Sequence, residues 1–156
     1  YMNKHKKKLV RASSACISAF FVILIISFIS LNTPHGYILA VSFGATMVLL
    51  FGYPSSPFAQ PKNIFFGHII TAISGIIFTF TSLPLFFAIA SAVSIGIFFM
   101  ILLDIVHPPA GGNPIAILIG QYSYDFLLIT IILGTILIIF LGIIINRFLL
   151  KIKYPS

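Results

Sequence analysis

Charged residues are scarce in this chain of 156 residues: nine are basic, two are acidic, and together they make up 7% of the sequence. Soluble domains carry about 25% charged residues, so this chain has too few polar groups to cover a water-facing surface. Hydrophobic residues make up 60% of it, and the mean hydropathy is +1.17. The apolar residues form continuous runs that do not alternate with polar ones, which excludes a transmembrane β-barrel. The composition therefore predicts an all-α, polytopic transmembrane helix bundle.

Cysteine and carboxylate side chains are also rare. Cys16 is the single cysteine, which excludes a disulfide framework and a cysteine metal cluster. Asp104 and Asp125 are the two carboxylates, and no serine lies in a G-x-S-x-G context. We therefore expect no enzyme, no cofactor and no metal site.

The basic residues that are present gather at the two ends of the chain. They are Lys4, Lys6, Lys7, Lys8 and Arg11 near the start, and Arg147, Lys151 and Lys153 near the end, with Lys62 between them. Clusters of this kind beside apolar spans mark the cytoplasmic side and contact anionic lipid. We accordingly expect residues 1–11 to form a basic cytoplasmic tail, and we expect no nucleic-acid partner.

Five apolar runs are candidate membrane spans, and a full crossing by a regular helix needs about 20 residues. They cover about 12–31, 37–51, 64–81, 85–103 and 126–146. The first run is too long for the apolar region of a signal peptide and no A-x-A site follows it, so we expect a retained helix. All six tyrosines lie at the ends of these runs, where amphipathic rings settle at a membrane interface.

Two proline-rich segments and two short turns separate the runs. The turns cover residues 31–36 and 82–84, and Pro54, Pro57 and Pro61 interrupt the chain after the second run. The second proline-rich segment, around Pro108 and Pro114, lies within 106–120, which is too short to cross a membrane as a regular helix. Proline cannot continue a helix, so we expect broken or re-entrant segments here.

The number of crossings is constrained by the basic ends. Five spans would place the two termini on opposite sides, whereas the positive-inside rule places both on one side. One resolution is that 106–120 enters the membrane as a broken crossing, and this is the resolution we favour. The other is that the C-terminal end violates the rule.

Small residues recur four positions apart, a spacing that lets helices approach closely in lipid. They are Ala88, Ala92 and Gly96 in one run, and Ala40 and Gly44 in another. We favour packing within one subunit over contact between subunits. A homo-oligomer is nevertheless compatible with so small a bundle.

The second proline-rich segment predicts an anion site. Asn113 suits the N-cap of a helix and the following proline suits its first position, so a helix should begin there. Such an N-terminus offers free N–H groups to a small anion, and Gly111 and Gly112 let a ligand approach the backbone. The first segment offers a similar arrangement through Ser56, Gln60, Lys62 and Asn63. Ordinary capped loops at the interface are the alternative for both segments.

Two histidines lie close to these segments. His107 precedes Pro108 and Pro109, and His68 lies one turn into the third run. A histidine inside a membrane usually faces a cavity or a partner, and it can relay protons or bind an anion when protonated. For His68 the alternative is a hydrogen bond to a neighbouring helix. Asp104 stands three residues before His107, which would place both on one face of a helix as an orienting contact, a proton relay or half of a metal site.

The residues His107-Pro108-Pro109, followed by a small residue and Gly111, resemble the signature of the HPP family of integral membrane proteins. The stretches Phe43-Gly44-Ala45, Leu49 to Gly52, Ser56 to Asn63 and Gly67-His68 are similar to that family in the same order. The resemblance covers nearly the whole chain. It implies a membrane protein whose plant plastid relatives are associated with nitrite transport. The family motif usually has arginine where Lys62 stands.

We therefore predict a transporter or channel for a small monovalent anion, with nitrite as the first choice. The anion pathway would use the residues of both proline-rich segments, with Lys62 and His107 supplying positive potential. The alternatives are a non-transporting interaction or sensor protein and, less favoured, a membrane-embedded enzyme around Asp104 and His107. We expect the bacterial plasma membrane as its location, with the plastid envelope as the alternative.

Overall fold

The computed structural model describes residues 3–32 and 39–156, and every regular element within these ranges is a helix. The α-helices are α1 (Lys4–Asn32), α2 (Val41–Met47), α3 (Pro61–Thr79), α4 (Leu85–Leu102), α5 (Asn113–Gly120) and α6 (Gly134–Ile144). π-Helical turns extend α2 over Val48–Gly52 and flank α6 at Phe126–Leu133 and Ile145–Leu149, and short 3-10 turns occupy Pro57–Ala59 and Pro108–Gly112. The predicted all-α class is confirmed.

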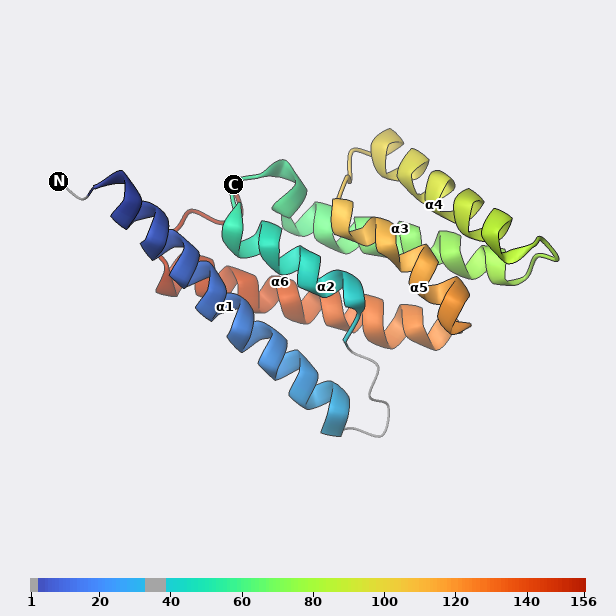
Figure 1. The fold of residues 1–156 in the computed structure, drawn as a ribbon, viewed down its shortest axis with the longest axis horizontal. Helices are drawn as coiled ribbons and strands as arrows, with labels where there is room; N and C mark the ends of the chain where they lie inside the picture. Colours follow the sequence, from blue (N-terminus) through green and yellow to red (C-terminus); the bar gives the residue numbers. More distant parts are fainter. Residues whose placement is uncertain (1–2, 33–38) are drawn as a thin grey trace.

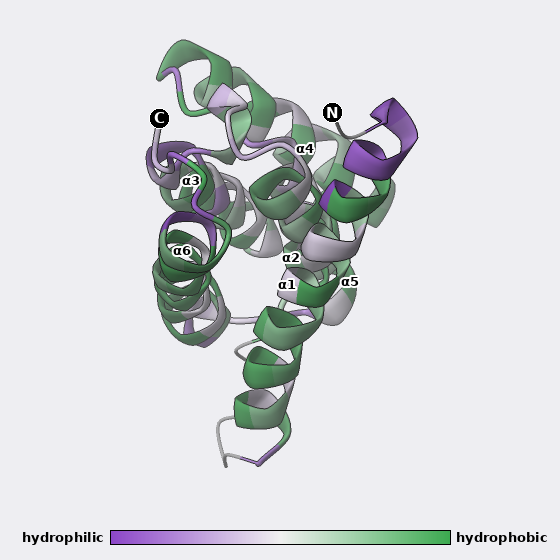
Figure 2. Cartoon of the chain, turned by 90° about the vertical axis from the view of Figure 1, so that its left-hand side faces the viewer, coloured by the Kyte–Doolittle hydropathy of each residue, from purple (hydrophilic) through white to green (hydrophobic). Residues whose placement is uncertain are grey.

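Four helices in the described ranges are long and apolar enough to cross a membrane. They cover Lys4–Asn32, Pro61–Thr79, Leu85–Leu102 and Phe126–Leu149. The 19 residues of α3 give a length of about 28 Å, which matches the hydrocarbon core of a bilayer. α1 begins at Lys4, ahead of the predicted start of the first span at residue 12, so the helix includes the basic stretch. Lysine and arginine are good helix formers, and Figure 2 shows this hydrophilic first part of α1 running into an apolar body.

The second helix is too short to cross a bilayer by itself. The seven residues of α2 and the five of its π turn give about 18 Å. The predicted polar turn at 31–36 and the predicted start of this span at residue 37 fall mainly on residues 33–38, which lie outside the described ranges. Pro54 follows the π turn and ends the helix, as predicted, because proline supplies no N–H and clashes with the preceding turn.

Consecutive helices alternate in direction along the long axis of the molecule (Figure 1). The short α5 runs opposite to α4 and to α6, and both termini lie toward the same end. With its preceding 3-10 turn, α5 covers 108–120, where the sequence predicts a broken segment at 106–120. This direction is the one that the broken-crossing interpretation requires.

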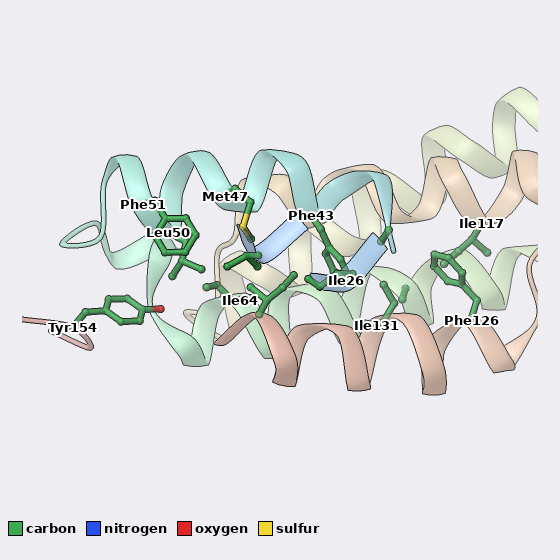
Figure 3. Close-up of a cluster of buried hydrophobic side chains, with 14 residues drawn as sticks. Ile26, Phe43, Met47, Leu50, Phe51, Ile64, Ile117, Phe126, Ile131 and Tyr154 are labelled. Carbon is green, nitrogen blue, oxygen red and sulfur yellow. The ribbon is translucent and has the colours of Figure 1, made fainter. Parts of the chain in front are cut away.

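The main core lies where α1, α2, α3, α5 and α6 meet. Figure 3 shows its side chains, which include Ile26, Phe43, Leu50, Ile64 and Ile131, all fully buried. Outside this core, large apolar side chains are exposed along α1 and α4, such as Phe86 at 68% and Phe28 at 65%. Water would not favour so much exposed apolar surface, whereas lipid does.

The predicted small-residue stripe forms the buried face of α4. Ala88, Ala92 and Gly96 are buried, and Gly96 lies so close to Thr71 of α3 that an added Cβ would come within 3.1 Å of its Cγ2. The hydroxyl of Ser74 on α3 donates to the Ala92 carbonyl at 2.7 Å. Packing within one subunit is thus confirmed for this stripe. The prediction is wrong for Gly44, which is exposed and has no other residue within 4 Å of an added Cβ.

Candidate functional site

The first proline-rich loop is held by its own side chains. The backbone N–H of Phe58 donates to Ser56 Oγ at 3.3 Å, so Ser56 caps the 3-10 turn Pro57–Ala59. The amide of Gln60 donates to the carbonyls of Pro54 at 3.0 Å and Ser56 at 2.9 Å. Ser56 and Gln60, both predicted to lie on the anion pathway, therefore use their polar groups to shape the loop.

Asn63 and Lys62 follow this loop at the start of α3. Asn63 donates its side-chain amide to the carbonyl of Val106 at 2.9 Å, which joins the first proline-rich loop to the second. Lys62 is exposed. Of these two predicted site residues, Asn63 therefore connects the loops while Lys62 points outward.

The predicted pairing of Asp104 with His107 on one helix face is wrong. α4 ends at Leu102, and Asp104 adopts a left-handed conformation with φ of 52°. The N–H of Ile105 then returns to the carbonyl of Met100 at 3.0 Å, a bond pattern that closes a helix and turns the chain away. As a result Asp104 is exposed while His107 is fully buried.

Four polar side chains meet in the interior, and we call them the histidine cluster: Thr46 of α2, His68 of α3, His107 of the second loop and Asn113 of α5. Their exposed fractions are 0%, 0%, 0% and 1%. Thr46 Oγ1 lies between the two imidazoles, 3.2 Å from His68 Nε2 and 3.0 Å from His107 Nε2. The ring centroids of the two histidines are 5.0 Å apart. The cluster joins four segments that are far apart in the sequence.

Backbone carbonyls fix the orientation of the outer members of the cluster. His107 Nδ1 lies 2.7 Å from the Phe58 carbonyl, which can only accept, so Nδ1 carries a hydrogen. Asn113 Nδ2 lies 3.2 Å from the His68 carbonyl, so this atom is the amide nitrogen, and Oδ1 accepts from Ser42 Oγ at 2.8 Å. The same amide donates to His68 Nδ1 at 2.9 Å and to Thr71 Oγ1 at 3.1 Å.

These orientations assign opposite tautomers to the two histidines. Because His68 Nδ1 accepts from Asn113, a neutral His68 carries its hydrogen on Nε2 and donates to Thr46. Because His107 carries its hydrogen on Nδ1, a neutral His107 accepts from the Thr46 hydroxyl at Nε2. The hydrogen bonds therefore run in one direction, from Asn113 through His68, Thr46 and His107 to the Phe58 carbonyl.

The N-terminus of α5 lies at mid-depth in the bundle. An added Cβ on Gly75 would lie 2.9 Å from Pro114 Cα, and Asn113 contacts His68, so α5 begins beside the middle of α3. α5 starts at Asn113, where the sequence predicts a helix start. The preceding 3-10 turn takes up some of its N–H groups, because Asn113 donates to the Ala110 carbonyl.

A cavity of about 610 Å³ adjoins the cluster where α2 and α5 begin. Its polar margin includes Ser42 and Asn113, and Pro109 and Gly112 also line it, while most of the remaining lining is apolar. Additional Cβ atoms on Gly111 and Gly112 would meet open space. The cavity thus brings Pro109, Gly112 and Asn113 together among the predicted site residues.

Among the residues that the structure describes, no charged side chain lines this cavity. Both carboxylates, Asp104 and Asp125, are exposed. Within the described ranges, no three His, Cys, Asp or Glu side chains form a group that could hold a metal ion. The polar groups bordering the cavity are therefore neutral hydrogen-bonding groups and helix N-termini.

Sequence reasoning missed Thr46, Ser42 and the Phe58 carbonyl. Ser42 and Thr46 stand four residues apart in an apolar stretch, and this spacing places both on one face of α2. That spacing was the available signal. The Phe58 carbonyl belongs to the backbone, so nothing in its residue type indicates the role.

The fold and the buried cluster define a polytopic α-helical membrane protein in which two proline-rich loops join short helices around paired histidines. The family described as the HPP transmembrane region matches residues 4–155. The chain therefore belongs to the HPP transmembrane family, and the predicted resemblance is confirmed.

Two transmembrane proteins of Dictyostelium discoideum are similar to this chain. One is 31% identical over 126 residues, which cover 76% of this chain and 44% of the relative. The other is 33% identical over 122 residues, which cover 73% of this chain and 39% of the relative. The chain thus spans less than half the length of these relatives. No solved structure matches it.

Proposed function

We propose that this protein is a transporter or channel for a small monovalent anion, with nitrite as the first choice. The observation that carries the proposal is the meeting of two short helices at one cavity. α2 and α5 both begin there, and Ser42 and Asn113, which line it, are joined by a hydrogen bond of 2.8 Å. Broken helices that begin at mid-depth around a binding site are typical of membrane transporters.

The electrostatics of the cavity favour an anion over a cation. Helix N-termini carry positive partial charge, and the first residues of α2 and α5 line this space. A cation would require carboxylates or a ring of free carbonyls, and the two carboxylates of the chain are exposed elsewhere. Such weak, neutral donors can bind an anion of a single charge and still release it.

Nitrite is the first choice because of the family. The resemblance to HPP proteins, whose plant plastid members are associated with nitrite transport, supports nitrite as the substrate. The location that we propose is the bacterial plasma membrane, with the plastid envelope as the alternative. The basic residues of both ends would face the cytoplasm and its anionic lipid.

A second candidate is a non-transporting interaction or sensor protein. The observation that favours it is that the side-chain nitrogens and oxygens of the histidine cluster are paired with protein groups and buried. A closed, fully paired cluster also suits a purely structural role. Transport measurements separate the two candidates.

The test is nitrite uptake into proteoliposomes, with chloride and nitrate as competitors and protein-free vesicles as the blank. We expect uptake above the blank, and we expect His107→Ala to lower the initial rate by about tenfold, which corresponds to about 1.4 kcal/mol. His5→Ala removes an exposed histidine and serves as the matched control.

Two outcomes would contradict the proposal. If folded wild-type protein gives no uptake under any gradient, the non-transporting candidate replaces it. If His107→Ala assembles normally and its flux equals that of His5→Ala, the anion pathway does not pass His107.

A further inference from the structure

The hydroxyl of Thr46 has more hydrogen-bond partners than it can serve in one arrangement. It has a single hydrogen to donate, and two acceptors compete for it: His107 Nε2 at 3.0 Å and the Ser42 carbonyl at 3.1 Å. At the same time its oxygen faces His68 Nε2 at 3.2 Å, from which it accepts. The hydroxyl can therefore turn between two acceptors that are both already in place.

The two positions of this hydrogen correspond to two protonation states. When His107 is neutral, its Nε2 has a lone pair, and the Thr46 hydrogen points to it. When a proton binds His107 Nε2, that nitrogen becomes a donor to Thr46 Oγ1. The hydroxyl hydrogen then turns to the Ser42 carbonyl, and no hydrogen bond is lost in either state.

A second proton, on His68, has no comparable hydrogen-bond acceptor. His68 could gain one only at Nδ1, where Asn113 already donates at 2.9 Å. Asn113 cannot reverse, because its Oδ1 accepts from Ser42 and its amide also faces the His68 carbonyl. Two donors would then oppose each other in a buried place, so the cluster accommodates one extra proton and resists two.

The surroundings leave this proton without a charged neighbour. Among the described residues, the charged side chains are all exposed, as is His5: Lys4, Lys6, Lys7, Lys8 and Arg11 of α1, Lys62 of α3, Asp104, Asp125, Arg147, Lys151 and Lys153. Tyr154 is buried beside the loop that carries the Phe58 carbonyl and donates its hydroxyl to the Ala59 carbonyl, whereas Tyr53 and Tyr122 are exposed. A buried imidazolium therefore gains most from an anion placed in the adjoining cavity.

We propose that Thr46, His68 and His107 form a single-proton site that couples one proton to each anion passing the cavity. This inference rests on the proposed function and specifies its coupling ion. A proton from the aqueous phase binds His107 Nε2, and the Thr46 hydroxyl then donates to the Ser42 carbonyl. An anion enters beside Ser42 and Asn113. Release on the other side reverses both steps, so no net charge moves with the pair.

The first test measures the histidines directly and needs no transport. Protein labelled with nitrogen-15 in histidine is placed in nanodiscs, and its histidine signals are followed by NMR from about pH 8 to about pH 4. This range extends about two units to either side of the ordinary histidine pKa. We expect His68 to carry its hydrogen on Nε2 and His107 on Nδ1, with only His107 gaining a proton. Identical tautomers, or joint protonation of both rings, would overturn the single-proton site.

The second test compares matched threonine variants in proteoliposomes. Wild-type nitrite uptake should rise with an inward proton gradient and should not respond to a membrane potential set by valinomycin and potassium. Thr46→Val should lose the stimulation by the proton gradient. Thr135→Val is the control, because Thr135 is also fully buried and also donates to the carbonyl four residues before it, whereas none of the histidines in the described ranges is hydrogen-bonded to it.

The outcomes separate this inference from the proposed function. Uptake that follows the membrane potential and ignores the proton gradient leaves anion transport standing and overturns the coupling. Equal stimulation of Thr46→Val and Thr135→Val overturns it as well. Absence of any uptake would contradict the proposed transport function. The NMR measurement of the histidine tautomers would still decide whether the single-proton site exists. The NMR measurement uses wild-type protein, so it tests the proposal even if a variant fails to fold.

Discussion

At the scale of single residues, Gly67 controls how closely the second proline-rich loop approaches α3. A Cβ added there would lie 2.8 Å from His107 Cβ and 3.0 Å from the Ile105 carbonyl oxygen. The backbone oxygen cannot move aside as the end of a flexible side chain can. The glycine thus permits the depth at which His107 reaches Thr46.

Gly67→Ala should therefore destabilise the protein and displace His107. We expect a loss of about 1–3 kcal/mol in the free energy of unfolding, the usual cost of inserting a methyl group into a packed interior. Denaturant titration in detergent measures this loss. Gly44→Ala is the control, since Gly44 is exposed in α2 with open space around it and should be neutral or slightly stabilising. Equal stability of both variants would show that the loop does not approach α3 this closely.

Tyr154 anchors the last residues of the chain to the first proline-rich loop. Its side chain is 1% exposed, and its hydroxyl donates to the Ala59 carbonyl at 2.7 Å. The next contact is the backbone N–H of Ser156, which donates to Gln60 Oε1 at 2.9 Å. Figure 3 shows Tyr154 at one end of the buried cluster. This segment therefore helps to hold the loop that carries the Phe58 carbonyl.

Tyr154→Phe should lower the free energy of unfolding by about 1 kcal/mol, because it removes one buried hydrogen bond and leaves the Ala59 carbonyl unpaired. Tyr124→Phe, at a tyrosine that is 65% exposed, should change little. The same denaturant titration compares the two. No difference between them would mean that the Ala59 contact adds nothing to stability.

The same residue gives a dependence on pH. Burial raises the pKa of the Tyr154 phenol above its ordinary value of about 10. A group whose pKa is raised on folding contributes stability that is complete below its unfolded pKa and is lost as the pH rises through the folded value. Wild-type stability should thus fall above about pH 10 more steeply than that of Tyr154→Phe. Parallel curves for the two proteins would exclude this linkage.

At the scale of helices, the contact between α3 and α4 depends on the small-residue face of α4. Ala92 is fully buried, whereas Ala90 on the same helix is exposed. Ala92→Phe should force the helices apart and cost several kcal/mol, roughly 3 by comparison with other overpacked sites. Ala90→Phe should leave stability unchanged. If Ala90→Phe instead changed the oligomeric state in detergent, an interface between subunits would lie on the other face of α4.

Helix positions were largely predictable, and the ways in which helices end were not. The continuous apolar run at 85–103 fixes α4 because only a helix satisfies its backbone in lipid, and the structure has Leu85–Leu102. The prediction that Asp104 and His107 share one helix face was wrong because of how α4 ends. An aspartate in a left-handed conformation reverses the chain after α4, and residue spacing alone does not reveal that conformation.

At the scale of the whole molecule, three members of the histidine cluster were predictable. His68 and His107 stood out because a histidine is costly inside a membrane, and Asn113 stood out because it precedes a proline at a predicted helix start. Thr46 did not stand out, since a threonine can satisfy its hydroxyl within its own helix, and the Ser42 carbonyl lies 3.1 Å from Thr46 Oγ1. Its contacts with two histidines arise only when α2 packs against α3 and the second loop, a long-range arrangement that no local pattern encodes.

The topology yields the last prediction. Alternating helices place both termini at one end of the molecule and the turn between α3 and α4 at the other (Figure 1). In a Cys16→Ser background, Lys4→Cys and Lys153→Cys should therefore react with a membrane-impermeant maleimide from the same side of oriented vesicles. Ser82→Cys, which is exposed in that opposite turn, should react only from the other side. Because the basic ends favour the cytoplasm, we expect the termini to be labelled from the cytoplasmic face. Labelling of the two termini from opposite faces would mean that α5 does not complete a crossing, and the positive-inside rule would then fail at the C-terminal end.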